Sequence, residues 1–148
     1  MKPSLRDAAI GALLGSLAVV GAFGLLVVFG IVKAAPWVLM WQRFVGGEGW
    51  VLAAIVGGVL FVGIGVLWGL PFALVEEPSP FKGVVYGVLP TVWAWTGMAI
   101  LLGQPPLGGL RPDGVLIPIV MNGLIWGSIL GAWCRRAVFG EGGGPVYY

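Results

Sequence analysis

The sequence predicts an all-α polytopic membrane protein, a single domain of four transmembrane helices arranged as two repeated hairpins, with a short interfacial helix in the first loop. The first observation is composition: 59% of the 148 residues are hydrophobic and 9% are charged, against about 25% charged in soluble domains. The second is four apolar runs long enough to cross a bilayer. The third is that all eight basic and six acidic residues can be placed outside these runs or at their ends. The predicted spans cover residues 8–32, 50–75, 81–103 and 114–137.

The first predicted span, residues 8–32, is an apolar run of roughly 25 residues that crosses a bilayer with some tilt. Lys2 and Arg6 precede it, as basic residues precede the core of a signal peptide. The run is longer than the about 7–15 apolar residues of a signal core, so it is interpreted as a membrane span.

A short helix is predicted in the following loop, over residues 36–45. Proline suits the first turn of a helix, and Pro36 stands there. Positions i, i+3, i+4 and i+7 then carry an apolar face. Two interpretations stay open: the helix lies flat at the membrane interface, or it caps the end of the bundle. The predicted interfacial residues are Trp37, Trp41, Phe44 and, at the start of the second span, Trp50.

An acidic turn separates the second span, residues 50–75, from the third, residues 81–103. Glu76 and Glu77 are adjacent, which is typical of some carboxylate sites. Because they stand among prolines and close to Lys82, they are interpreted as a solvated turn.

Two prolines mark the third and fourth spans. Pro90 falls inside the third and predicts a kink, and Thr91 and Thr96 can bond the backbone carbonyls that a kink frees. Pro118 is placed in the first turn of the fourth span, residues 114–137. The tail, residues 138–148, shows no periodicity.

Glycines four residues apart recur on all four spans, a spacing that lets helix backbones approach closely. They predict a glycine zipper, with more stripes than the core of a monomer needs. The predicted helix-packing residues are Gly11, Gly15, Gly57, Gly65, Gly69, Gly83, Gly87, Gly123, Gly127 and Gly131.

Polar side chains inside the spans are few. The most distinctive is Asn122, a carboxamide that directly precedes the first glycine of the stripe in the fourth span. It either lines a path for a small solute or forms an interhelical hydrogen bond worth about 0.6–2 kcal/mol, and the hydrogen bond is the favoured interpretation. The predicted polar residues in the membrane are Asn122, Ser128, Thr91 and Thr96.

The basic residues predict the orientation. Five lie at the end of the bundle that holds both termini, and three lie at the other end. The positive-inside rule then places both termini in the cytoplasm. The two groups are Lys2, Arg6, Lys82, Arg135 and Arg136, and Lys33, Arg43 and Arg111.

The chain carries a weak internal repeat. Residues 6–11 (RDAAIG) align with residues 82–87 (KGVVYG), and residues 58–61 (GVLF) with residues 123–126 (GLIW). Each half is then a basic residue, a span, a loop and a glycine-rich span, related by an axis along the membrane normal. Chance similarity is the alternative, because glycine and tryptophan are abundant here.

Four segments occur in a fixed order: GVLFVGIGVLWGLPFALV, PFKGVVYGVLPTVWAW, LGQPPLGG and NGLIWGSILG. Together they resemble the YagU-like group of small bacterial four-helix membrane proteins, over roughly residues 57–136. The resemblance implies the architecture and a bacterial inner membrane. That group often carries a histidine ahead of a G-x-x-x-G stretch in the second and fourth spans. Here Val59 and Asn122 stand in those neighbourhoods, so no role resting on that histidine is carried over. The activity of the group is not established.

Several function classes are disfavoured. The chain has no histidine, one cysteine (Cys134) and no ionisable residue at mid-span, so enzymes, proton-coupled exporters, metal sites and redox cofactors are not expected. Met98, Met121 and Cys134 are interpreted as packing residues. The net charge of +2 does not indicate nucleic acid binding. No cofactor is expected, although bound lipid suits the composition.

Two function hypotheses follow. The first is a non-catalytic accessory subunit of a larger membrane complex, assembled through the glycine stripes with other subunits or with itself. The second is a small homo-oligomeric channel or transporter for a small solute, which the repeat and the Pro90 kink favour.

Overall fold

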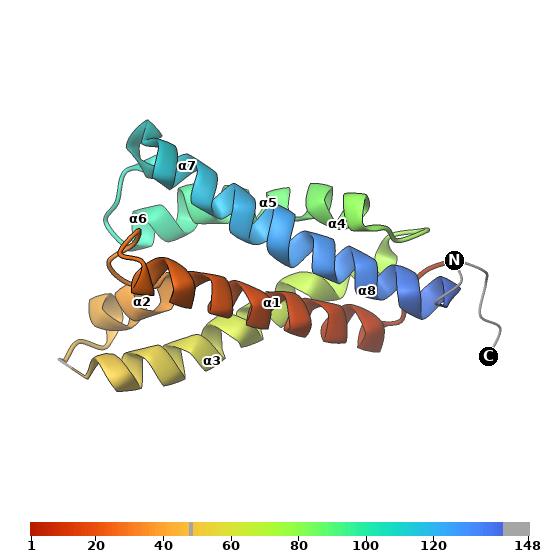
Figure 1. Cartoon of the computed structure of the whole chain (residues 1–148), viewed down its shortest axis with the longest axis horizontal. Coiled ribbons are helices and arrows are strands. Elements are labelled where there is room, and N and C mark those ends of the chain that lie inside the picture. The colour runs from red at the N-terminus through yellow and green to blue at the C-terminus, as the bar shows by residue number, and fades with distance from the viewer. Residues whose placement is uncertain (48, 141–148) are drawn as a thin grey trace.

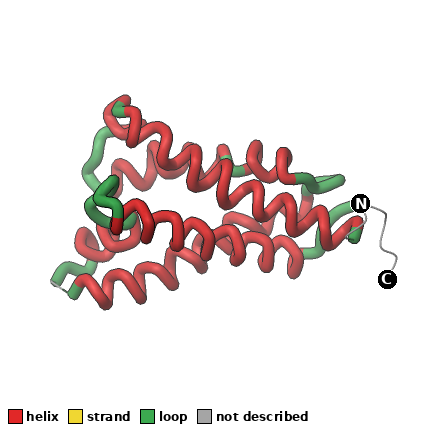
Figure 2. Tube along the Cα trace, viewed as in Figure 1, coloured by secondary structure: helices red, strands yellow, loops and turns green. Residues whose placement is uncertain are grey.

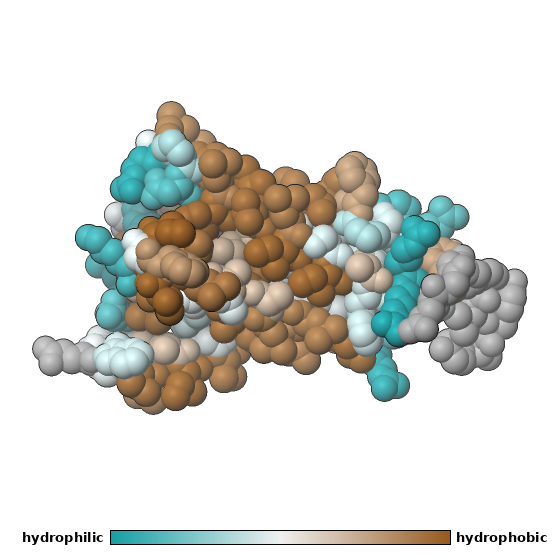
Figure 3. Space-filling view, in the orientation of Figure 1, coloured by the Kyte–Doolittle hydropathy of each residue, from teal (hydrophilic) through white to brown (hydrophobic). Residues whose placement is uncertain are grey.

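The computed structural model describes residues 1–47 and 49–140, and every regular element in them is a helix (Figures 1 and 2). The predicted all-α fold of four long apolar helices is confirmed. Figure 3 shows an apolar belt between two polar ends. The protein is therefore a multi-pass membrane protein, and lipid contacts its belt. The four spans are Leu5–Val28, Trp50–Leu74, Pro80–Leu101 and Pro112–Phe139.

The first span is α1 (Leu5–Val28), which begins and ends earlier than the predicted 8–32. Ser4 starts it with a capping box: its Oγ accepts a hydrogen bond from the Asp7 N–H at 3.1 Å, and the Asp7 carboxylate accepts one from the Ser4 N–H at 3.2 Å. Gly30 takes φ 71° shortly after the end, so the helix stops although the apolar run continues.

The loop helix is α2 (Pro36–Phe44), one residue shorter than predicted. Trp37 was expected at the interface, and this was wrong because its side chain is buried in the core. Its ring centroid lies 5.7 Å from that of Phe23 and 4.9 Å from that of Phe61. Gly57 has no side chain, so the backbone of Trp37 comes close to it. Of the other predicted interfacial residues, Trp41 is half-buried and Phe44 and Trp50 are exposed.

The second span is α3 (Trp50–Gly69) followed by the 3₁₀ turn η1 (Leu70–Leu74), which contains Pro71. The other two spans are each divided. The third consists of α4 (Pro80–Tyr86), α5 (Val88–Trp93), the π-helical η2 (Ala94–Met98) and α6 (Ala99–Leu101). The fourth, after the turn η3 (Pro106–Leu110), consists of α7 (Pro112–Pro118), the π-helical η4 (Ile119–Gly127) and α8 (Ser128–Phe139).

Proline explains these divisions in part. The third span breaks at Gly87, because Pro90 lacks an N–H and its ring crowds the carbonyl four residues earlier. The fourth span begins at Pro112 rather than at residue 114. Pro118 therefore lies further inside the helix than predicted. Within the predicted tail, residues 138 and 139 belong to α8, and residues 141–148 lie outside the described part of the chain.

The first and fourth spans form the centre of the bundle. In each, 33% of the apolar window is buried, against 17% in the second and third spans. α1 packs on α3, α8 and η4, and α4 packs on α8 and η4 (Figure 1). The second span thus flanks the first, and the third flanks the fourth.

All ten predicted packing glycines lie against other helices or loops of the same chain, since a Cβ on any of them would meet such an atom within 4 Å. A Cβ on Gly83 would overlap the carbonyl oxygen of Gly127, for example. The stripes are therefore used inside the chain, and the expected surplus of stripes for partners is not found among these ten. The closest neighbours are Leu130 for Gly11, Trp126 for Gly15, Trp37 for Gly57, Ser16 for Gly65, Ala12 for Gly69, Gly127 for Gly83, Asn122 for Gly87, Val84 for Gly123, Gly83 for Gly127 and Ser79 for Gly131.

Candidate solute-binding cavity

A cavity of about 780 Å³ lies between α1, α2, α3 and the third and fourth spans. It forms because the second and third spans meet at one end of the bundle and diverge toward the other. At the end where they meet, the Tyr86 hydroxyl donates to the carbonyl of Trp68 at 2.7 Å, and the ring of Tyr86 lies 5.2 Å from that of Phe72. Beyond Tyr86 the third span packs on the fourth, while α3 packs on α1 and α2.

The cavity runs from the α2 end of the bundle to mid-span. The lining at the α2 end, here named the mouth, includes Gln104 and Asp113, and the lining at mid-span, here named the deep end, includes Ser16, Asn122 and Trp126. Ser16 is at the middle of α1, and Asn122 is near the middle of the fourth span. Past this depth, toward the termini, the helices close on one another through their glycines.

Both π-helical segments line the cavity. η2 contributes Trp95 and Met98, and η4 contributes Met121 and Asn122. Single π-helical turns inside α-helices occur frequently at functional sites. Thr91 ties the two spans together beside these segments, because its hydroxyl bonds the carbonyls of Gly87 at 2.7 Å and Pro118 at 3.2 Å.

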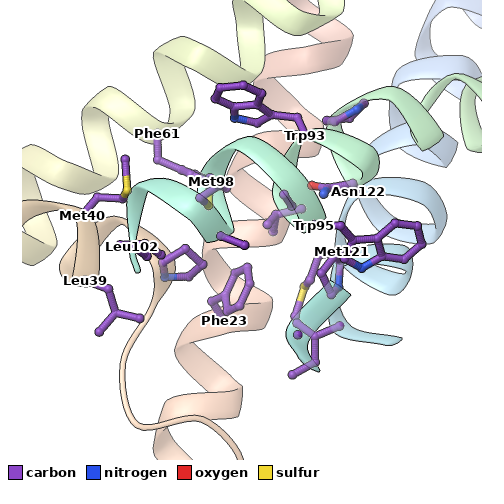
Figure 4. Close-up of a pocket in the computed structure, with 18 of the residues that line it drawn as sticks. Phe23, Leu39, Met40, Phe61, Trp93, Trp95, Met98, Leu102, Met121 and Asn122 are labelled. Carbon is purple, nitrogen blue, oxygen red and sulfur yellow. The ribbon is translucent and has the colours of Figure 1, made fainter. Parts of the chain in front are cut away.

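The walls are mostly apolar, with six aromatic and three methionine side chains among aliphatic ones (Figure 4). In the view of Figure 4, Leu39, Met40 and Leu102 lie on one side, and Trp95, Met121 and Asn122 lie on the other. A concave apolar lining with few polar groups is typical of small-molecule sites, and the volume falls in their usual range of about 300–1,000 Å³.

The polar residues predicted in the membrane have different partners. Ser128 donates to the carbonyl of Leu124, and Thr96 donates to that of Val92 at 2.7 Å, so both hydroxyls bond their own helix. The side chain of Asn122 makes no hydrogen bond with any described residue. The favoured interhelical hydrogen bond is therefore absent from the described part of the chain, and the carboxamide lines the cavity instead.

Ser16 supplies the second polar group at the deep end. It is 1% exposed, and its Oγ accepts a hydrogen bond from the Trp126 indole N–H at 3.2 Å. Trp126 in turn stacks on Tyr86 with ring centroids 6.2 Å apart. The floor of the cavity is therefore the indole of Trp126, which belongs to the fourth span and is hydrogen-bonded to the first.

Charge is confined to the mouth. Among the described residues, Asp113 is the only charged one that lines the cavity, and its carboxylate pairs with the Arg111 guanidinium, Nη2 to Oδ2 at 2.8 Å and Nε to Oδ1 at 3.2 Å. Among the described residues, no three His, Cys, Asp or Glu side chains gather as metal ligands would.

Sequence reasoning missed most of the lining. Trp93 and Trp95 were not candidates, and Met98 and Met121 were interpreted as packing residues, yet all four line the cavity. A usable signal was the position of Pro90 and Pro118 upstream of these residues, because each proline removes one backbone hydrogen bond.

Comparison of the chain with protein-family models, with curated proteins and with solved structures finds no match.

Proposed function

We propose that the protein is a non-catalytic membrane carrier for a small solute, which enters at the α2 end and binds in the cavity. The observation that carries this proposal is a cavity whose lining runs from the loops at the α2 end of the bundle to mid-span, beyond which the helices close on one another through their glycines. A site reached from one side at a time is the geometry of a carrier rather than of an open channel. One chain holds the whole cavity, so the proposal needs no oligomer.

A pair of cysteine variants tests whether water and solutes reach the cavity. In a Cys134→Ala background, Met98→Cys puts a thiol on the lining, and Ile100→Cys puts one on the same span at a residue that is 65% exposed on the apolar belt. N-ethylmaleimide reacts with the thiolate, which needs water to form. We expect fast reaction at position 98 and slow reaction at position 100 in liposomes. Equally slow reaction at both would overturn the proposal.

A second candidate is the accessory subunit, and one observation favours it. Gly21, Gly24 and Gly63 are exposed on the apolar belt, and a Cβ on any of them would meet nothing within 4 Å. Such open glycines suit close contact with a helix of another chain. Purification in a gentle detergent tests this: stoichiometric partners that are lost in Gly21→Leu would support the candidate, and a pure single chain would contradict it.

We infer that both termini face the cytoplasm of a bacterial inner membrane. The support is the excess of Lys and Arg at the terminal end, where Lys2 pairs with Glu76 at 3.4 Å and Lys82 donates to the Glu76 carbonyl at 2.6 Å. An impermeant thiol reagent added outside cells should label Arg43→Cys and spare Lys2→Cys. The reverse pattern would invert the topology.

A further inference from the structure

The chemistry of the lining narrows the class of solute, and the starting point is charge. In the part of the chain that the structure describes, no lysine or arginine lines the cavity, and Asp113 is already paired at the mouth. An ion at mid-span would leave water without meeting an opposite charge, which is costly in an apolar surrounding. The deep end therefore favours an uncharged solute.

The deep end also offers unfilled hydrogen bonds. The Asn122 carboxamide has donors and an acceptor that no described residue uses, and the Ser16 hydroxyl accepts from Trp126 but has no recorded acceptor for its own proton. Polar groups left unpaired in an apolar site cost free energy. A solute that brings one hydrogen-bonding group to this depth would remove that cost, whereas a hydrocarbon chain would not.

The walls between mouth and deep end favour rings. Trp68, Trp93 and Trp95 line the cavity together with Phe23 and Phe61. Aromatic pairs prefer offset-stacked or edge-to-face contacts, so flat rings gain more from these walls than flexible chains do.

We propose that the carrier binds an uncharged, ring-containing molecule with a single hydrogen-bonding group, of the phenol or indole class. The ring lies among the tryptophans, and its polar group bonds Asn122 at mid-span. The inference rests on the proposed function, because it assigns the solute class of the same cavity.

Three probes that share the naphthalene ring test the need for a hydrogen bond and for the absence of charge: 1-naphthol, naphthalene and 1-naphthoate. The variant is Met98→Cys in the Cys134→Ala background. For each probe, the measurement is the free aqueous concentration that halves the rate at which N-ethylmaleimide reacts with the thiol at position 98. We expect 1-naphthol to protect at about five- to ten-fold lower concentration than naphthalene, the effect of one hydrogen bond. The anion 1-naphthoate should not protect.

Variants assign the hydrogen bond. Asn122→Leu, of similar size, should remove the difference between 1-naphthol and naphthalene. Thr96→Val should keep the difference, because the Thr96 hydroxyl already bonds Val92. If Asn122→Leu fails to fold, Asn122→Ala gives the same comparison.

The experiment separates failure of the proposed solute class from failure of the carrier function itself. No reaction at Met98→Cys overturns the carrier itself. Reaction with equal protection by naphthalene and 1-naphthol overturns only the solute class, because it shows that a hydrogen bond from the solute adds nothing to binding. Protection by 1-naphthoate overturns the requirement for an uncharged molecule.

Discussion

At the scale of single residues, glycines in this protein mark contacts between two backbones. Gly83 and Gly127 face one another so closely that a Cβ on either would overlap the carbonyl oxygen of the other. Spacing in the sequence predicted such contacts because it places glycines on one helix face. It could not predict their partners, because a stripe does not say which other helix it meets.

Gly127→Leu should prevent correct packing of the third span on the fourth, because no side chain fits between the two backbones. Overpacked sites cost about 1–3 kcal/mol, and a backbone neighbour cannot move aside as a side chain can. The measurement is the yield of folded protein and its unfolding midpoint in detergent. Gly21→Leu is the control, since nothing lies within 4 Å of its added Cβ. Equal loss in both variants would contradict the assignment.

The two polar residues at mid-span should differ in their contribution to stability. Ser16→Ala removes the acceptor of the buried Trp126 N–H, so we expect a loss of about 1–2 kcal/mol in the free energy of unfolding. Asn122→Ala removes no hydrogen bond within the described residues and should cost less. Chemical denaturation in mixed micelles would compare them, and a larger loss for Asn122→Ala would show a structural role for the carboxamide.

At the scale of elements, hydropathy was sufficient to place four spans within a few residues of their observed ends. The π-helical segments η2 and η4 were not predictable, because a π-helical turn changes the hydrogen-bond register without changing the apolar pattern. For the same reason Asn122 could be recognised as unusual, but its exposure to a cavity could not be deduced. The equivalence of the two hairpins stays a prediction.

The contact between Tyr86 and Trp68 joins α3 to the third span at the closed end of the cavity. Tyr86→Phe keeps the ring packed on Phe72 and Trp126 but removes this hydrogen bond. We expect a loss of about 0.6–1.7 kcal/mol, the range found for hydrogen bonds between membrane helices. Stability to denaturant measures it. A loss as large as that of Tyr86→Ala would show that the hydroxyl, not the ring, holds the two spans together.

At the scale of the whole molecule, the cavity is a consequence of topology. α1 packs on η4 and α8 of the fourth span, so the second and third spans lie on either side of this pair and separate toward the α2 end. Composition predicts that such helices enter a membrane. It does not predict which pairs touch, since the apolar windows of the four spans are apolar nearly all round and each could pack on any other.

Carriage requires the closed end to open, and the native Cys134 reports on that step. Cys134 is 0% exposed on α8, the helix that packs on α1. Release of a solute toward the termini needs the central helices to separate there, which would bring water to the thiol.

The experiment uses the wild-type protein in liposomes. Reaction of Cys134 with N-ethylmaleimide should be slow and should accelerate several-fold with 1-naphthol. The reason is that a solute shifts the population toward states that bind it better. The anion 1-naphthoate is the matched control. If 1-naphthol protects position 98 yet leaves Cys134 unreactive, the protein binds its solute without carrying it across.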